Sequence, residues 1–230
     1  MTPVFKRAQS FARLVAGGNA TLALHLLATR LHSHTRFLGL RHDLQEPSVV
    51  PAARIDVDVR PLRADDDLSF LDPDPALDRN ANWVRTEQRK LVDANIPTCW
   101  VAVAEGNRIA YMQWLVGPSD NPTIQERWRG LFPQLAPDEA LLEGAYTPEA
   151  FRGMGVMPHA MARITEAARQ LGVRYVITFV KDGNIPALKG SMKSGFRPHL
   201  ERQHSWSLFR RKVVFTPLPP GTTFPFEKGS

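Results

Sequence analysis

The chain has 230 residues, enough for a sizeable core in one domain with an extension, and its 43% hydrophobic and 23% charged residues are typical of globular proteins. Because Cys99 is the single cysteine, an intramolecular disulfide is excluded, and a reducing, cytoplasmic setting is the simplest expectation. The net charge of +6 would suit an anionic partner, but no lysine-rich run or aromatic-interleaved basic stripe indicates nucleic acid.

The N-terminal stretch is expected to be helical. Residues 3–33 carry apolar clusters separated by basic residues, with a break at Gly17-Gly18-Asn19. Packing on its own domain or on a partner subunit fits this stretch better than lying on a membrane surface, and it leaves a homodimer open. No apolar run reaches the roughly 18 residues that a membrane span requires. Residues 43–53 contain two prolines and resemble a linker, so we expect a helical extension and linker over residues 1–53.

From residue 54 onward, strand and helix patterns alternate along the chain. Runs with a period of two or with continuous apolar character predict strands, and apolar residues spaced by three and four predict helices. Strands are expected at 55–60, 99–104, 109–116, 141–146, 173–180, 200–208 and 211–215, and helices at 75–95, 157–171 and 186–193. This order predicts an α/β fold over residues 54–218, in which a mixed central sheet carries helices on both faces.

Two further segments have a less regular pattern. Residues 117–137 form an insertion with a short helical piece, where Trp128 and Phe132 either cover a binding pocket or pack as a cluster on the sheet. Residues 219–230 are rich in proline, with Pro219, Pro220 and Pro225, and are expected to run as an extended tail over the surface.

The most informative segment joins the predicted strand 141–146 to the helix that begins near residue 157. The strand passes through a turn into Arg152-Gly153-Met154-Gly155. Closely spaced glycines at a helix start leave backbone N–H groups unpaired, with the positive end of the helix dipole behind them. Such a loop can hold a phosphate or pyrophosphate largely by its main chain. A plain strand–helix turn would also contain such glycines, so the residues on either side have to distinguish an anion-binding loop from an ordinary turn.

With its flanking residues this segment resembles the GNAT superfamily of acyl-CoA-dependent N-acyltransferases. Arg152 and Gly155 match the pyrophosphate motif of that family, whereas Met157 stands where the family has Gly or Ala. A second signature is matched by Asn184, by Ala187 three residues later and by Gly195-Phe196. The resemblance covers residues 141–215, is weaker from residue 55, and does not extend to the first fifty residues.

The resemblance implies direct transfer of an acetyl or other acyl group from acyl-CoA to a primary amine. Acetyl-CoA is then the expected co-substrate, and no metal is expected, because His32 and His34 have no third ligand nearby. The pyrophosphate would lie on the glycine loop, and the pantetheine arm on the backbone at the end of the strand. The residues implied in CoA binding are Tyr146, Thr147, Arg152, Gly153, Met154, Gly155, Val156, Met157 and Asn184.

Glu143 is the candidate catalytic base. It lies on the strand that should point at the acyl group, where burial would raise its pKa toward a useful range, although an ordinary salt-bridged carboxylate would fit the same pattern. Ser191 occupies the position at which many family members have an acidic tyrosine, so the general acid is left open. Tyr146 ends the same strand, but a buried tyrosine is more often part of the core.

Two other classes of function stay open. The serine at position 191 is also compatible with an acyl-CoA-binding sensor that has little or no catalytic activity. The positive net charge is compatible, more weakly, with a transferase that uses aminoacyl-tRNA as donor. The sequence indicates neither the acceptor, nor the acyl chain length, nor the oligomeric state.

Overall fold

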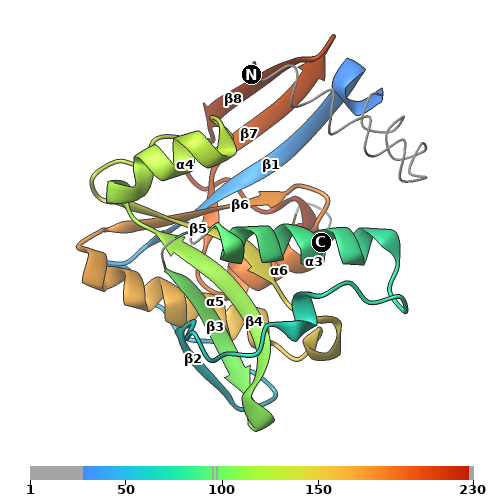
Figure 1. Ribbon diagram of the computed structural model, residues 1–230. Helices are drawn as coiled ribbons and strands as arrows, with labels where there is room; N and C mark the ends of the chain where they lie inside the picture. Colours follow the sequence, from blue (N-terminus) through green and yellow to red (C-terminus); the bar gives the residue numbers. More distant parts are fainter. Residues whose placement is uncertain (1–27, 95, 97, 228–230) are drawn as a thin grey trace.

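A computed structural model describes residues 28–94, 96 and 98–227 and shows one central sheet with helices on both faces (Figure 1). The strands are β1 His32–Asp43, β2 Val57–Pro61, β3 Cys99–Ala104, β4 Arg108–Val116, β5 Glu139–Tyr146, β6 Tyr175–Lys181, β7 Arg197–Ser207 and β8 Arg210–Pro217. The helices are α3 Arg79–Asp93, α4 Asn121–Trp128, α5 Val156–Ala167 and α6 Ile185–Lys193. The α/β fold with a mixed sheet is therefore confirmed.

The eight strands follow the order β2-β3-β4-β5-β6-β1-β7-β8. Every neighbouring pair is antiparallel except β5 and β6, which are parallel and are connected through α5. A parallel pair requires a crossover, and the helical pattern after the glycine loop supplies it. The single parallel pair thus lies directly beside the segment that the sequence singles out.

The helices pack in two layers because each has one apolar face. On one side of the sheet, α5 buries Val156, Ala160, Met161 and Ile164, and α6 adds Leu188. The opposite side is covered by α3 and α4, which contribute apolar side chains such as Ile124 to a second cluster. Within the part of the chain that the structure describes, no helix has both the length and the apolar character to cross a bilayer.

The predicted helical extension and linker over residues 1–53 is wrong for residues 32–43, which form strand β1. His32–Asp43 form a strand inside the sheet, antiparallel to β6 on one side and to β7 on the other. Leu38 and Leu40 are buried there, and a Cβ on Gly39 would lie 2.5 Å from Leu200 Cδ1. The first half of the strand is polar and partly exposed, so its pattern gives little strand signal. Residues 1–27 of the expected helical stretch lie outside the described residues.

Two surface segments are more firmly packed than their sequence suggests. Phe132 is buried against Phe179 of β6, with Trp128 edge-on to it at 5.4 Å between ring centroids, so this pair packs on the sheet. The sequence predicts a tail that runs extended over the surface, but Phe224 is 1% exposed and joins the core on the α5 side. Phe226 stacks on Phe224 at 5.3 Å, so this part of the tail is anchored.

Candidate active site

Strands β5 and β6 pair over only part of their length. The parallel register runs from Glu139 opposite Tyr175 to Leu142 opposite Thr178 and then stops. Beyond it, Gly144 has a φ of +70°, and the β4–β5 register shifts, which are the marks of a bulge that bends a strand. A Cβ on Gly144 would lie 2.7 Å from Trp114 Cε3, so glycine is required there. The end of β5 therefore presents an unpaired backbone edge on its β6 side.

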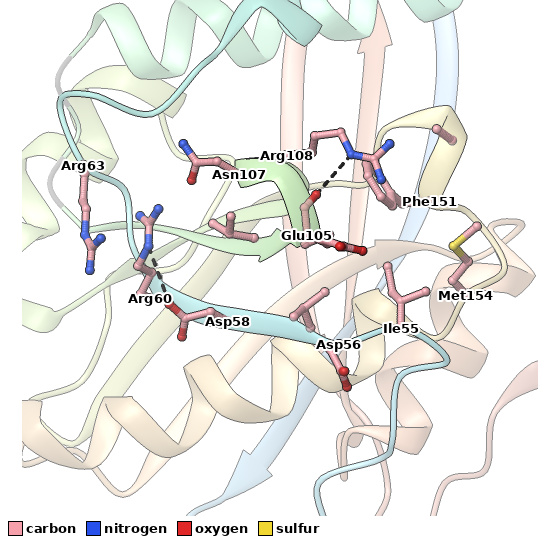
Figure 2. Close-up of a pocket in the computed structure, with 14 residues that line it drawn as sticks. Ile55, Asp56, Asp58, Arg60, Arg63, Glu105, Asn107, Arg108, Phe151 and Met154 are labelled. Carbon is pink, nitrogen blue, oxygen red and sulfur yellow. Dashed lines mark hydrogen bonds and ion pairs between the residues drawn. The ribbon is translucent and has the colours of Figure 1, made fainter.

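A cavity of about 650 Å³ lies at this end of β5. Its walls come from β5, from the glycine loop, from the first turn of α5 and from α6. They include the predicted CoA-binding residues Tyr146, Thr147, Arg152, Gly153, Gly155, Val156, Met157 and Asn184. Met154 is the exception, because it lines a separate, open pocket beside β2, near Ile55 and Phe151 (Figure 2). The structure thus brings distant parts of the predicted site into one cavity.

The glycine loop has the geometry of an anion-binding helix start. Gly153 and Gly155 have φ values of +77° and +74°, a region that side-chain-bearing residues rarely adopt. Helix α5 begins immediately afterwards at Val156, so the N–H groups of Val156 and Met157 have no partners within the helix, and Pro158 has no N–H. Around Gly153 a Cβ would meet nothing within 4 Å, whereas at Gly155 it would lie 3.3 Å from Ala52 O. Gly155 is therefore close to the protein's own backbone as well as to the cavity.

The charged side chains that line the cavity are all basic. They are Arg152, Lys189 and Lys193, and no described acidic residue lines it. Arg152 is held at the rim, because it pairs with Glu149 at 2.7 Å and donates to Thr147 O at 3.2 Å. The two lysines lie one turn apart on α6 and were missed in the sequence, where the available signal was their spacing of four residues from each other on the helix that follows Asn184. This lining suits a polyanionic ligand.

Met157 and Asn184 support the cavity walls. A Cβ on Gly190 of α6 would lie 2.9 Å from Met157 Sδ, so the methionine fills space that the glycine leaves between the two helices. Asn184 Oδ1 accepts a hydrogen bond from Ala187 N at 3.3 Å and caps the start of α6. The departure at position 157 is thus accommodated by a small residue on the facing helix.

Glu143 is half-buried on β5, opposite Trp114 in the β4–β5 register, and it is not among the residues that line the cavity. Desolvation of its carboxyl raises the pKa to about 7, while the charge of Arg202 and the N–H of Gly144 act to lower it. Among the described residues this carboxyl makes no ion pair within 4.0 Å, so the geometry does not support an ordinary salt bridge. A carboxyl with a pKa near 7 can exchange a proton at physiological pH.

Arg202 is the charged residue near this carboxyl that sequence reasoning missed. It is 5% exposed, it donates to Leu131 O at 2.8 Å, and its guanidinium lies over the rings of Phe37 and Phe179 at 4.0 and 4.8 Å. Arg202 lies on β7 and is separated from β5 in the sheet by β1 and β6. Its proximity to Glu143 depends on the inserted strand β1, so no local pattern could have indicated it.

The hydroxyls at positions 191 and 146 differ in their surroundings. Ser191 is fully buried in α6 and does not line the cavity, so it cannot face a ligand there. Tyr146 lines the cavity, and its hydroxyl is buried without a hydrogen-bond partner among the described residues. Burial raises the pKa of Tyr146, although the nearby Arg85 acts in the opposite direction. Tyr146 therefore keeps its proton at neutral pH.

Several solved structures are similar to this chain, including the following three. One is an acetyltransferase of the GNAT family from Colwellia psychrerythraea, 14% identical over 81% of this chain and 57% of its own, with a TM-score of 0.46. Another is a GCN5-related N-acetyltransferase from Sphaerobacter thermophilus, 14% identical over 88% and 58%, with a TM-score of 0.48. The third is a GCN5-related glucosamine N-acetyltransferase region of a fungal multi-domain GH3 β-N-acetylglucosaminidase, 14% identical over 80% and 22%, with a TM-score of 0.54.

This chain spans less than two thirds of the length of each of these proteins. Of the three, the last has a TM-score above 0.5, and at 14% identity it shows a common fold and no more. No curated protein matches the chain. A family model described as the acetyltransferase (GNAT) family matches residues 61–196, which is more than half of the chain and includes every residue that lines the cavity. The chain therefore belongs to the GNAT family of acetyltransferases.

Proposed function

We propose that this acetyltransferase moves an acetyl group from acetyl-CoA directly to a primary amine, with Glu143 as the general base. The observation that carries the proposal is the cavity at the end of β5. It combines an unpaired strand edge, a helix start with free N–H groups and a basic lining. These three features match the pantetheine amides, the pyrophosphate and the overall negative charge of coenzyme A.

Different residues of the cavity would bind different parts of acetyl-CoA. The main chain of Gly153–Met157 would hold the pyrophosphate, with Arg152 and the two α6 lysines supplying positive charge around it. The backbone of Tyr146 and Thr147 would pair with the pantetheine arm along the free edge of β5. Asn184 keeps the start of α6 in place beside that arm. In this orientation the thioester would lie at the end of β5, three residues along the strand from Glu143, which does not itself line the cavity.

Glu143 would take the proton that the amine must lose. The amine nitrogen bonds to the thioester carbonyl carbon, the carbon–sulfur bond breaks, and the sulfur leaves as a thiolate that must be neutralised. A carboxyl whose pKa is raised to about 7 is partly ionised at neutral pH, so its carboxylate form can accept this proton. Tyr146 is the hydroxyl available to donate to the departing sulfur, because it lines the cavity and keeps its proton at neutral pH, with Arg85 beside it.

The experiment that tests this proposal separates donor binding from turnover. Calorimetry should show acetyl-CoA binding, and mass spectrometry of a cell extract incubated with the protein and acetyl-CoA should show products heavier by one acetyl group. Binding of acetyl-CoA without turnover over a broad panel of amines would instead favour an acyl-CoA sensor. Binding of tRNA without binding of CoA would favour a transferase that uses aminoacyl-tRNA.

A further inference from the structure

The segment before β2 lies against the glycine loop. Arg54 N donates to Met154 O at 2.8 Å, and the ring Nδ1 of His159, on α5, lies 2.9 Å from Pro51 O. Since a carbonyl oxygen can only accept, His159 carries its proton on Nδ1 and donates it. Between these two hydrogen bonds, Ala52 O lies 3.3 Å from the Cβ position of Gly155. We call residues 51–54 the brace. They precede the matched family region, residues 61–196.

The hydrogen bond from Arg54 fixes one peptide plane of the anion-binding loop. In a trans peptide the C=O and the following N–H point in opposite directions, and no cis peptide bond is present in the described residues. Because Met154 C=O points at the brace, the N–H of Gly155 points away from it. Gly155 lines the cavity, whereas the brace residues do not. This bond therefore keeps an N–H donor turned away from the brace, on the cavity side of the loop.

His159 secures the brace without touching the cavity. It lies one turn into α5, where its own N–H donates to Gly155 O at 3.3 Å, and it is absent from the cavity lining. One side chain therefore contacts both the loop and the brace that orients it. A loop held in its binding conformation before the ligand arrives loses less conformational entropy on binding.

We propose that the brace, held by His159, positions the glycine loop for the pyrophosphate of acetyl-CoA, so that His159 is a positioning residue for the donor. This inference rests on the proposed function. Because the brace acts on the loop alone, it should affect donors that carry a pyrophosphate and leave a donor without one unaffected. S-acetylpantetheine, which ends before the pyrophosphate, is the matched probe.

The test compares His159→Leu, which keeps the volume and removes the donor, with His159→Asn, whose side-chain N–H can replace Nδ1–H. For the leucine variant we expect about tenfold weaker CoA binding by calorimetry and a similar rise in KM for acetyl-CoA, with kcat within about twofold of the native value. The asparagine variant should recover most of the affinity. With S-acetylpantetheine, kcat/KM should be unchanged in both. Arg54→Pro, which removes the main-chain donor, is a second variant should the leucine variant fold poorly.

Results that differ from these expectations would contradict the inference. Native CoA affinity in a folded leucine variant would show that the brace does not position the loop. Equal losses with acetyl-CoA and S-acetylpantetheine would show a general structural effect of His159 and leave the proposed function intact. Failure of the native protein to bind CoA would contradict the proposed function itself, and the inference with it.

Discussion

Glu143, the proposed general base, lies on β5, where burial raises the pKa of its carboxyl. Its placement on β5 follows from the sequence, because the strand pattern and the glycine loop fix its position relative to the donor site. Its pKa of about 7 does not follow, since that value depends on enclosure by the whole sheet and on Arg202, which is remote in sequence. A residue can thus be located from a pattern while its chemistry is set by distant neighbours.

Replacement of the Glu143 carboxyl by an amide tests the base. Glu143→Gln should lower kcat about a hundredfold or more, because the amide cannot accept the amine proton, while acetyl-CoA binding stays the same. In the native protein, kcat should rise with pH through about 7, where this carboxyl ionises. The amide variant should lose that limb of the pH–rate profile. Near-native turnover in the variant would make Glu143 structural.

The same carboxyl predicts how stability depends on pH. Its pKa is raised from 4.5 in the unfolded chain to about 7 in the fold, so the folded state binds the proton more tightly. The stability that this group contributes is complete below pH 4.5 and is lost as pH rises through about 7. Glu143→Gln, which cannot ionise, should therefore raise Tm relative to the native protein at pH 8 more than at pH 5. Thermal unfolding at the two pH values measures this difference, and an equal effect at both would contradict it.

The two hydroxyls should respond differently to removal. Ser191→Ala should change kcat less than about threefold, because its hydroxyl is buried outside the cavity. Tyr146→Phe should lower kcat about tenfold with little change in acetyl-CoA affinity, since it removes the hydroxyl available to the departing sulfur. Steady-state kinetics on both variants shows which of the two hydroxyls contributes to turnover. A large loss in the serine variant with normal folding would reverse the assignment.

The elements around the site show why some of them were predictable. Helix α5 and strand β6 carry their own periodic patterns, and the glycine loop carries a local backbone requirement, so each is visible in a short window of sequence. The contact of Met157 with Gly190 joins two helices and is not visible in either alone. The same holds for Ala52 against Gly155, which joins the brace to the loop. Sequence reasoning therefore found the parts of the site and missed the contacts between those parts.

The α5–α6 contact gives a prediction for donor binding. In Gly190→Ala the new methyl group would lie 2.9 Å from Met157 Sδ, so the methionine has to move. Both residues line the cavity, and we expect the displaced side chain to weaken CoA binding about threefold to tenfold. Met157→Ala in the same chain should restore the affinity, because it removes the colliding atoms. Calorimetry on the two single variants and the double variant measures this coupling, and additive effects would contradict it.

The whole sheet depends on a strand that sequence reasoning assigned to an extension. Strand β1 pairs with β6 and β7 at once, so it joins the half of the sheet that carries the cavity to the β7–β8 hairpin. Arg202 reaches the surroundings of Glu143 from β7, across β1. The family match begins at residue 61, after this strand. Residues outside the matched family region therefore join the β7–β8 hairpin to the half of the sheet that carries the cavity.

Removal of β1 should consequently prevent the rest of the chain from folding. A chain that begins at residue 54 would leave β6 and β7 without their common neighbour and would expose apolar surface that Leu38 and Leu40 now cover, so we expect it to be insoluble or unfolded by circular dichroism. In the full chain, Leu40→Ala should lower the free energy of unfolding by about 2 to 5 kcal/mol, because Leu40 is 0% exposed. Val49→Ala is the matched control, since Val49 is 84% exposed, and its effect should stay within about 0.5 kcal/mol. A soluble truncated chain that binds CoA would show that β1 is dispensable and that the domain begins, as the sequence pattern suggests, near residue 54.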